Sequence, residues 1–176
     1  MNKAALIVTL SLLCAAPAHA TDYFETAGDI GQYAVPAAAL GIALWQKDWT
    51  GCFQFAASYA ATLAVSYGLK YTVKETRPNG LDDRSFPSGH TSSAFCGAAF
   101  LDIRYGPAYG IPAYGAASLV GWSRIESNMH YPLDVVAGAV IGIAGNLVFT
   151  RAKVKNVKVV PVADHGSYGA VVVYQW

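Results

Sequence analysis

Five apolar segments rich in alanine and glycine limit how this chain of 176 residues can fold. Small side chains at this density let helices approach one another closely, as they do in bundles within a membrane. Glycine and proline inside the segments, as in YGIPAYGAASLVGW, are also tolerated better there than in a soluble helix. The segments cover residues 31–45, 51–73, 88–103, 109–122 and 131–149. The pattern predicts an all-α helical bundle, integral to a membrane, in one domain of residues 21–157.

A soluble all-α domain, with helices buried on most sides, has a similar hydrophobic pattern. Three of the segments are shorter than the ~18 residues that mark a membrane span, so length alone does not separate the two folds. If the chain starts outside a membrane, Lys47, Arg104 and the basic residues within 151–155 all lie inside, as membrane proteins prefer. The outer turns nevertheless hold five further cations: Lys70, Lys74, Arg77, Arg84 and Arg124. Cations there break the positive-inside tendency, which indicates that they serve a site.

The first twenty residues, MNKAALIVTLSLLCAAPAHA, resemble an export signal. Lys3 supplies a positive start, an apolar run follows, Pro17 interrupts it, and AHA is a small-x-small cleavage site. The apolar run of about 13 residues is short of the ~20 that span a membrane, which favours a signal peptide of residues 1–20. The alternative is an uncleaved first membrane helix, which would raise the number of helices from five to six.

The last segment, residues 158–176, has a different character. Its sequence, KVVPVADHGSYGAVVVYQW, alternates around glycine and ends in β-branched and aromatic residues. This pattern predicts two short strands with a turn at His165-Gly166. We expect a short β-like tail, either a hairpin or a segment packed on the bundle, and the sequence assigns it no function.

Three polar stretches share the outer side, KYTVKETRP, PSGHTSS and SRIESNMHYPLD, and their residues are suited to binding a phosphate group. Lys70, Arg77 and Arg124 offer three permanent cations, enough to hold a dianion. In the PSGH stretch, Ser88 is a good N-cap for a helix, and Gly89 lets a ligand approach the backbone. Free N–H groups at a helix start bind phosphate readily.

The stretch SRIESNMHYPLD adds groups that can carry out chemistry. His130 and Asp134 are four residues apart and share a face if a helix begins near Tyr131, so Asp134 can orient the imidazole. An oriented, neutral histidine is a nucleophile, and His90 remains to protonate a leaving alcohol. The sequence has no His, Cys and carboxylate cluster with metal-ligand spacing, so we expect no metal and no other cofactor, with the cations in the metal's place.

Each stretch taken alone also has a structural explanation. A His-x-x-x-Asp pair is often structural, PSGH is an ordinary helix start, and outer cations can bind lipid headgroups. All three stretches together, in one order and on one side, favour a shared site.

These stretches together resemble the signature of the type 2 phosphatidic acid phosphatase superfamily: Lys-x6-Arg-Pro, Pro-Ser-Gly-His and Ser-Arg-x5-His-x3-Asp, within residues 70–134. The resemblance implies metal-independent hydrolysis of phosphate monoesters or diphosphates through a phosphohistidine at His130. It also implies that His90 acts first as the acid and then as the base for water, with Asp134 beside the nucleophile. The residues that would hold the phosphoryl oxygens are Lys70, Arg77, Ser88, Gly89 and Arg124.

We therefore expect a lipid phosphatase of the bacterial inner membrane, with its site facing the periplasm and a phosphorylated lipid as its substrate. The alternatives are a soluble periplasmic acid phosphatase of broad specificity and a lipid phosphotransferase that uses the same intermediate. Vanadate-dependent haloperoxidases are related by their site but are much larger chains. A non-enzymatic scaffold would tolerate the loss of His90 or His130, and both are present in this sequence. A net charge of +1, without a basic block interleaved with aromatics, excludes a nucleic-acid partner. The oligomeric state does not follow from the sequence.

Overall fold

The computed structural model describes residues 20–153, 156–164 and 167–175, and the side chains of residues 23–153. The predicted signal peptide lies outside the described residues except for Ala20, and the predicted turn at His165-Gly166 lies outside them as well.

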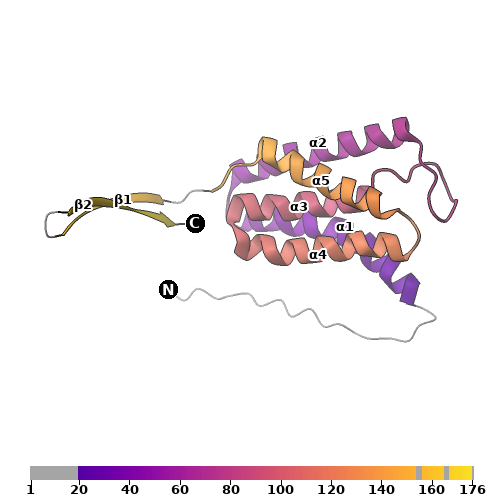
Figure 1. The fold of residues 1–176 in the computed structure, drawn as a ribbon, viewed down its shortest axis with the longest axis horizontal. Coiled ribbons are helices and arrows are strands. Elements are labelled where there is room, and N and C mark those ends of the chain that lie inside the picture. Colours follow the sequence, from indigo (N-terminus) through magenta and orange to yellow (C-terminus); the bar gives the residue numbers. More distant parts are fainter. Residues whose placement is uncertain (1–19, 154–155, 165–166, 176) are drawn as a thin grey trace.

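Five α-helices followed by two strands make up the described chain (Figure 1). The helices are α1 (Ala20–Trp45), α2 (Trp49–Val73), α3 (Gly89–Tyr105), α4 (Pro107–Glu126) and α5 (Pro132–Phe149). Helix α3 lies in the middle of the bundle and packs against each of the other four. The predicted all-α bundle is therefore confirmed for the part of the chain that the structure describes.

Helix α1 is longer than the apolar pattern indicates. It begins at Ala20, whereas the first apolar segment begins near residue 31. The additional turns are polar, so hydrophobic periodicity does not reveal them, and they pack against α3 and α4 through contacts with the candidate site described below.

After α5, β1 (Asn156–Asp164) and β2 (Ser167–Gln175) pair antiparallel, with Asp164 opposite Ser167. Among the described elements, the two strands contact each other and none of the helices. The tail therefore takes no part in positioning the site.

The core of the bundle combines aromatic rings with small side chains. Phe55 of α2 and Phe100 of α3 have ring centroids 5.0 Å apart, and Phe100 meets Tyr105 edge-on at 5.7 Å. Between α1, α3 and α4 the buried residues are small, and they include Ala94, Ala98, Ala117 and Val120. Because alanine occupies little space, these three helices lie close together.

Two glycines of α5 bring that helix against α3. A Cβ atom on Gly138 would lie 2.5 Å from the carbonyl oxygen of Ser88, and one on Gly142 would lie 2.5 Å from that of Ser92. These neighbours are backbone atoms and cannot rotate away. The contact therefore requires glycine, and it fixes the start of α5 beside the start of α3.

A buried ion pair closes the opposite end of the bundle. Arg104 of α3 donates to both carboxylate oxygens of Asp48, from Nη2 at 2.7 Å and from Nε at 2.8 Å. The Tyr105 hydroxyl donates to the same carboxylate, and the Gly51 N–H donates to it at the start of α2. The hydrogen bond from Arg104 holds the pKa of Asp48 well below its usual range. This paired charge joins α3 to the turn between α1 and α2.

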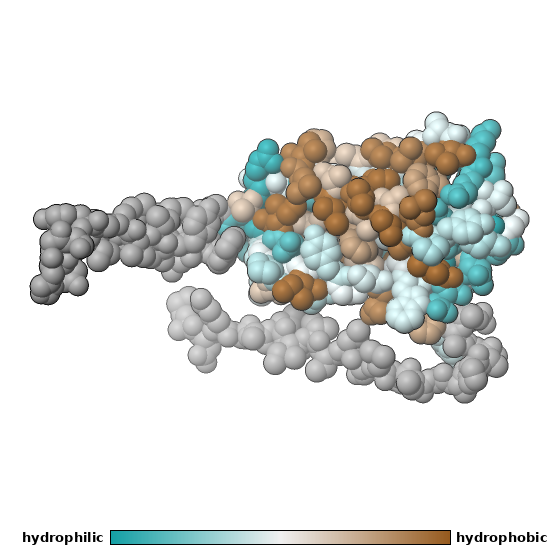
Figure 2. Space-filling view, in the orientation of Figure 1, coloured by the Kyte–Doolittle hydropathy of each residue, from teal (hydrophilic) through white to brown (hydrophobic). Residues whose placement is uncertain are grey.

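Much of the bundle's surface is apolar (Figure 2). On α5 alone the exposed side chains include Leu133, Val136, Val140, Leu147 and Val148. Within the described residues, α5 is the one helix whose length and composition would let it cross a membrane. Insertion of the whole bundle into a membrane stays a prediction.

Gly142→Ala should destabilise the bundle by about 1–3 kcal/mol, because its Cβ would meet backbone atoms of α3. Gly115→Ala on α4 is the matched control, since a Cβ there would meet nothing within 4 Å. The control should be neutral or stabilising by up to about 1 kcal/mol, because alanine is the better helix former. Thermal unfolding of the two purified variants measures both effects, and equal midpoints would contradict the close approach.

Candidate active site

One cavity at the end of the bundle brings together residues from four separate parts of the sequence: α1, α2 with the loop after it, α3, and His130. It has a volume of about 360 Å³ and opens beside the first turn of α3. Five of the eight residues expected in the site line it: Lys70, Arg77, Gly89, His90 and His130. The other three, Ser88, Arg124 and Asp134, are buried behind its wall.

His130 lies between two groups that determine which of its ring nitrogens carries the proton. Its Nε2 is 3.1 Å from Nη1 of Arg77. An arginine can only donate, so Nε2 accepts this bond with its lone pair. The Nδ1 atom, 3.4 Å from Oδ2 of Asp134, then carries the proton. The imidazole is therefore in the tautomer with its proton on Nδ1 and its lone pair on Nε2, next to Arg77.

Burial and the positive charges of Arg77 and Lys70 together lower the pKa of His130 to about 4, against the opposing effect of Asp134. His130 is only 2% exposed. At neutral pH its imidazole is therefore uncharged, which is the form that can attack an electrophile.

Asp134 is itself held by two donors from neighbouring segments. Its Oδ2 accepts the hydroxyl of Ser85 at 2.5 Å and the backbone N–H of Tyr131 at 2.9 Å. Glu75 lies next to Asp134, and burial together with the Asp134 charge raises the pKa of Glu75. The carboxylate therefore has a fixed position beside His130.

The start of α3 is capped as the sequence indicates. The Ser88 hydroxyl oxygen lies 3.4 Å from the N–H of Thr91 and accepts the Thr91 hydroxyl at 2.9 Å. The N–H of Ser88 donates to the carbonyl of Asp134 at 3.0 Å. This bond joins the start of α3 directly to the first turn of α5.

Lys70 and Arg77 line the cavity and also hold the loop between α2 and α3. Lys70 Nζ donates to the carbonyl of Arg84 at 2.7 Å, and Arg77 Nε donates to Asp82 at 2.8 Å. Arg77 Nη1 also donates to the carbonyl of Met129. These contacts leave both cations at the cavity, where they favour an anionic ligand.

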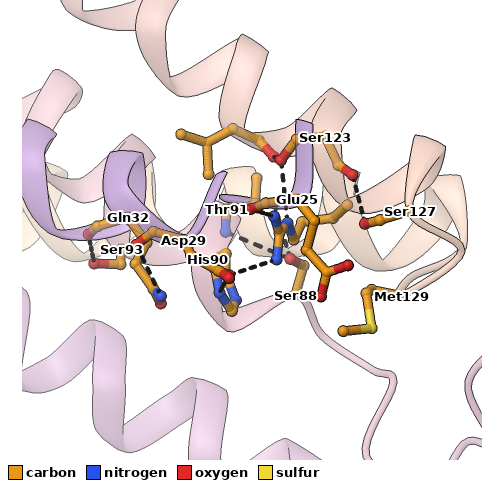
Figure 3. A network of polar contacts seen from close by, with 12 residues as sticks. Glu25, Asp29, Gln32, Ser88, His90, Thr91, Ser93, Ser123, Ser127 and Met129 are labelled. Atoms are coloured by element: carbon orange, nitrogen blue, oxygen red, sulfur yellow. Dashed lines mark hydrogen bonds and ion pairs between the residues drawn. The ribbon is translucent and has the colours of Figure 1, made fainter. Parts of the chain in front are cut away.

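Arg124 differs from the other two cations because its guanidinium is 1% exposed and does not line the cavity. Its Nε donates to the hydroxyl of Ser123, Nη1 to Asp29 at 2.8 Å, and Nη2 to the carbonyl of Glu25 (Figure 3). Binding of phosphoryl oxygens by Arg124 stays a prediction, and in this arrangement its donors are engaged by α1 and α4.

Sequence reasoning missed several residues of this site. Asp29 contacts His90 and Arg124, and Ser85 and Glu75 lie at Asp134. Four tyrosines also line the cavity. The tyrosines are Tyr33, Tyr59, Tyr67 and Tyr71. No spacing rule links Asp29 to His90, which is 61 residues away. The i, i+4 spacing of Tyr67 and Tyr71 with Leu63 is the one signal that was available.

In residues 23–153 there is no group of three or more His, Cys, Asp or Glu side chains placed to hold a metal ion. Three cations, Lys70, Arg77 and Arg84, line the cavity.

The fold and the cavity together define an all-α bundle with a cavity lined by cations and two histidines at one end. The chain belongs to the PAP2 superfamily, whose family model matches residues 51–158. The resemblance noted in the sequence is therefore confirmed.

The curated relatives include proteins named as phosphatases. A lipid A 1-phosphatase of Porphyromonas gingivalis is 43% identical over 77 residues, which are 42% of this chain and 17% of that protein. An undecaprenyl-diphosphatase of Sulfolobus acidocaldarius is 29% identical over 96 residues, covering 48% of this chain and 47% of that protein. The chain thus spans less than half the length of these two relatives.

The crystal structure of Aquifex aeolicus LpxE has a similar fold. It matches with a TM-score of 0.64 and 26% identity, over 76% of this chain and 87% of that one. The matched part of the present chain therefore includes most of the helical bundle.

Arg77→Gln should raise the pKa of His130 by about one unit, because a positive charge and a donor to Nε2 are both removed. Titration of the imidazole by NMR in histidine-labelled protein measures the shift. Arg151→Gln, at the opposite end of the bundle, is the control and should leave the pKa unchanged. A His130 pKa that is the same in both variants would mean that Arg77 does not act on the imidazole.

Proposed function

We propose that this protein is a metal-independent lipid phosphatase that hydrolyses phosphate monoesters or diphosphates through a phosphohistidine at His130. The observation that carries the proposal is the hydrogen bond from Arg77 to Nε2 of His130, with Asp134 beside Nδ1. It supports a neutral imidazole whose lone pair is directed toward cations that can hold a phosphoryl group.

In the first step, the Nε2 lone pair attacks phosphorus and the bond from phosphorus to the leaving oxygen breaks. His90 gives a proton to that oxygen, and Lys70 and Arg77 stabilise the charge on the remaining oxygens. In the second step, water attacks the phosphohistidine and gives its proton to His90. Phosphate leaves, and both histidines return to their starting forms. Asp134 keeps the His130 proton on Nδ1 throughout.

We infer a lipid substrate from the surroundings of the cavity. Exposed apolar side chains cover much of α5 and other helices, and such a surface suits contact with lipid. The names of the relatives, a lipid A 1-phosphatase and an undecaprenyl-diphosphatase, agree with a phosphate carried by a lipid. We also propose that the protein lies in the bacterial inner membrane with the cavity on the periplasmic side. Cations on that side break the positive-inside tendency, and binding of a phosphate group gives them a function.

His130→Ala should abolish phosphate release, with a loss of about 10³-fold or more, because no other group replaces the nucleophile. The assay uses protein purified in detergent with EDTA present. It compares phosphatidic acid, a polyprenyl diphosphate and lipid A with a small chromogenic monoester. Retention of more than a few per cent of the activity would exclude His130 as the nucleophile. Preference for the small ester, in protein that is soluble without detergent, would favour a secreted acid phosphatase. Transfer of phosphate to an added alcohol would reveal a phosphotransferase.

Asp134→Asn should lower the turnover rate by about 10²-fold or more, because an amide no longer holds the proton on Nδ1. The thermal unfolding midpoint serves as the check that the bundle is intact. Ser85→Ala, which removes one donor to the same carboxylate, should lower the rate by a smaller factor. An unchanged rate for Asp134→Asn would mean that the carboxylate only caps α5.

A further inference from the structure

Helix α1 supplies a carboxylate to the site although it precedes the residues that the family model matches. Oδ1 of Asp29 lies 2.9 Å from Nε2 of His90 and 2.8 Å from Nη1 of Arg124 (Figure 3). One oxygen atom thus joins the expected acid to the buried arginine.

The position of Asp29 is fixed by tight packing on both sides. A Cβ atom on Gly28 would lie 2.0 Å from the Ser123 hydroxyl oxygen, so α1 is pressed against α4 one residue before Asp29. One turn later, the carbonyl of Gln32 accepts the hydroxyl of Ser93 on α3 at 2.7 Å. The register of α1 against α3 and α4 therefore places Asp29 opposite His90.

The contact between Asp29 and His90 determines which ring nitrogen of His90 carries a proton. A carboxylate can only accept, so Nε2 of His90 must donate to Asp29. Nδ1 is then the nitrogen that remains for a substrate, and no hydrogen bond joins it to another residue in the part of the chain that the structure describes. His90 lines the cavity. A carboxylate thus lies at a different ring nitrogen in each histidine: Asp134 beside Nδ1 of His130, and Asp29 at Nε2 of His90.

The charges around His90 give Asp29 a second effect. Burial, the positive charge of Arg124 from α4 and that of Arg77 from the loop after α2 lower the pKa of His90 to about 4. Lys70 of α2 also lines the same cavity. The carboxylate of Asp29 opposes these cations and favours the protonated ring that an acid needs.

We propose that Asp29 is the positioning residue for His90: it holds the Nε2 proton, stabilises the charged imidazole, and leaves Nδ1 to deliver a proton to the leaving oxygen. The Nδ1–H bond breaks and an O–H bond forms on the leaving group, while the Nε2 proton stays with the Asp29 contact. Water later returns a proton to Nδ1 as it attacks the phosphohistidine. The inference rests on the proposed function and makes α1 a part of the active site.

The test compares two phosphate esters that carry the same long alkyl chain, one an alkyl ester and the other a nitrophenyl ester. An alkoxide needs a proton to leave, whereas a nitrophenolate leaves without one, so only the alkyl ester depends on the acid. For Asp29→Asn we expect kcat to fall by about 10²-fold on the alkyl ester and by only a few-fold on the nitrophenyl ester. Asp83→Asn, an exposed carboxylate of the loop before α3, is the matched control and should retain both activities.

Two further measurements separate positioning from a structural role. The thermal unfolding midpoint reports whether Asp29→Asn is folded, and Asp29→Ala assayed with added formate should recover part of its alkyl-ester activity. The imidazole nitrogen shifts of His90, read without substrate, should show the proton on Nε2 in the wild type and lose that preference in Asp29→Asn.

Equal losses on the two esters, or no loss, would overturn the inference. A gain in activity with tighter vanadate binding would also overturn it, because Asp29 would then be a carboxylate that competes with phosphate. Release from neither ester by the wild type would instead contradict the proposed function, whereas the nitrogen shifts test the contact of Asp29 with His90 by themselves.

Discussion

The close approach of α5 to α3 is the contact on which the candidate site depends. Gly138 leaves no room for a side chain against the carbonyl of Ser88, and the N–H of Ser88 donates to the carbonyl of Asp134. Two backbone contacts thus set the distance between the first turns of both helices. His130 and His90 belong to these turns or directly precede them, so their separation follows from the backbone and not from adaptable side chains.

Charge is concentrated at the two ends of the bundle, and each end uses it differently. Asp48 and Arg104 neutralise each other within the fold, together with the Tyr105 hydroxyl. At the other end, Lys70 and Arg77 line an open cavity and exceed the negative charge of Asp82 beside them. The first arrangement holds helices together, whereas the second leaves positive charge for a ligand.

The sequence predicted what depends on short-range pattern. Helix positions follow from apolar segments, and the motif residues Lys70, Arg77 and His130 meet at one cavity because each lies in or beside a turn at the same end of the bundle. Asp29 was missed because its contacts with His90 and Arg124 arise from the packing of α1. The burial of the Arg124 side chain also arises from the packing of α1, since its partners are residues about a hundred positions earlier.

The bond between Arg77 and Nε2 of His130 has a consequence for which molecules can reach that nitrogen. The lone pair of Nε2 accepts a hydrogen bond from Arg77, which is also the side chain that would meet an incoming anion. An anion that draws Arg77 toward itself also uncovers the nitrogen, so recognition and unmasking are one event. In the proposed mechanism, neutral electrophiles offer the guanidinium nothing to bind, and Nε2 of His130 stays covered in their presence.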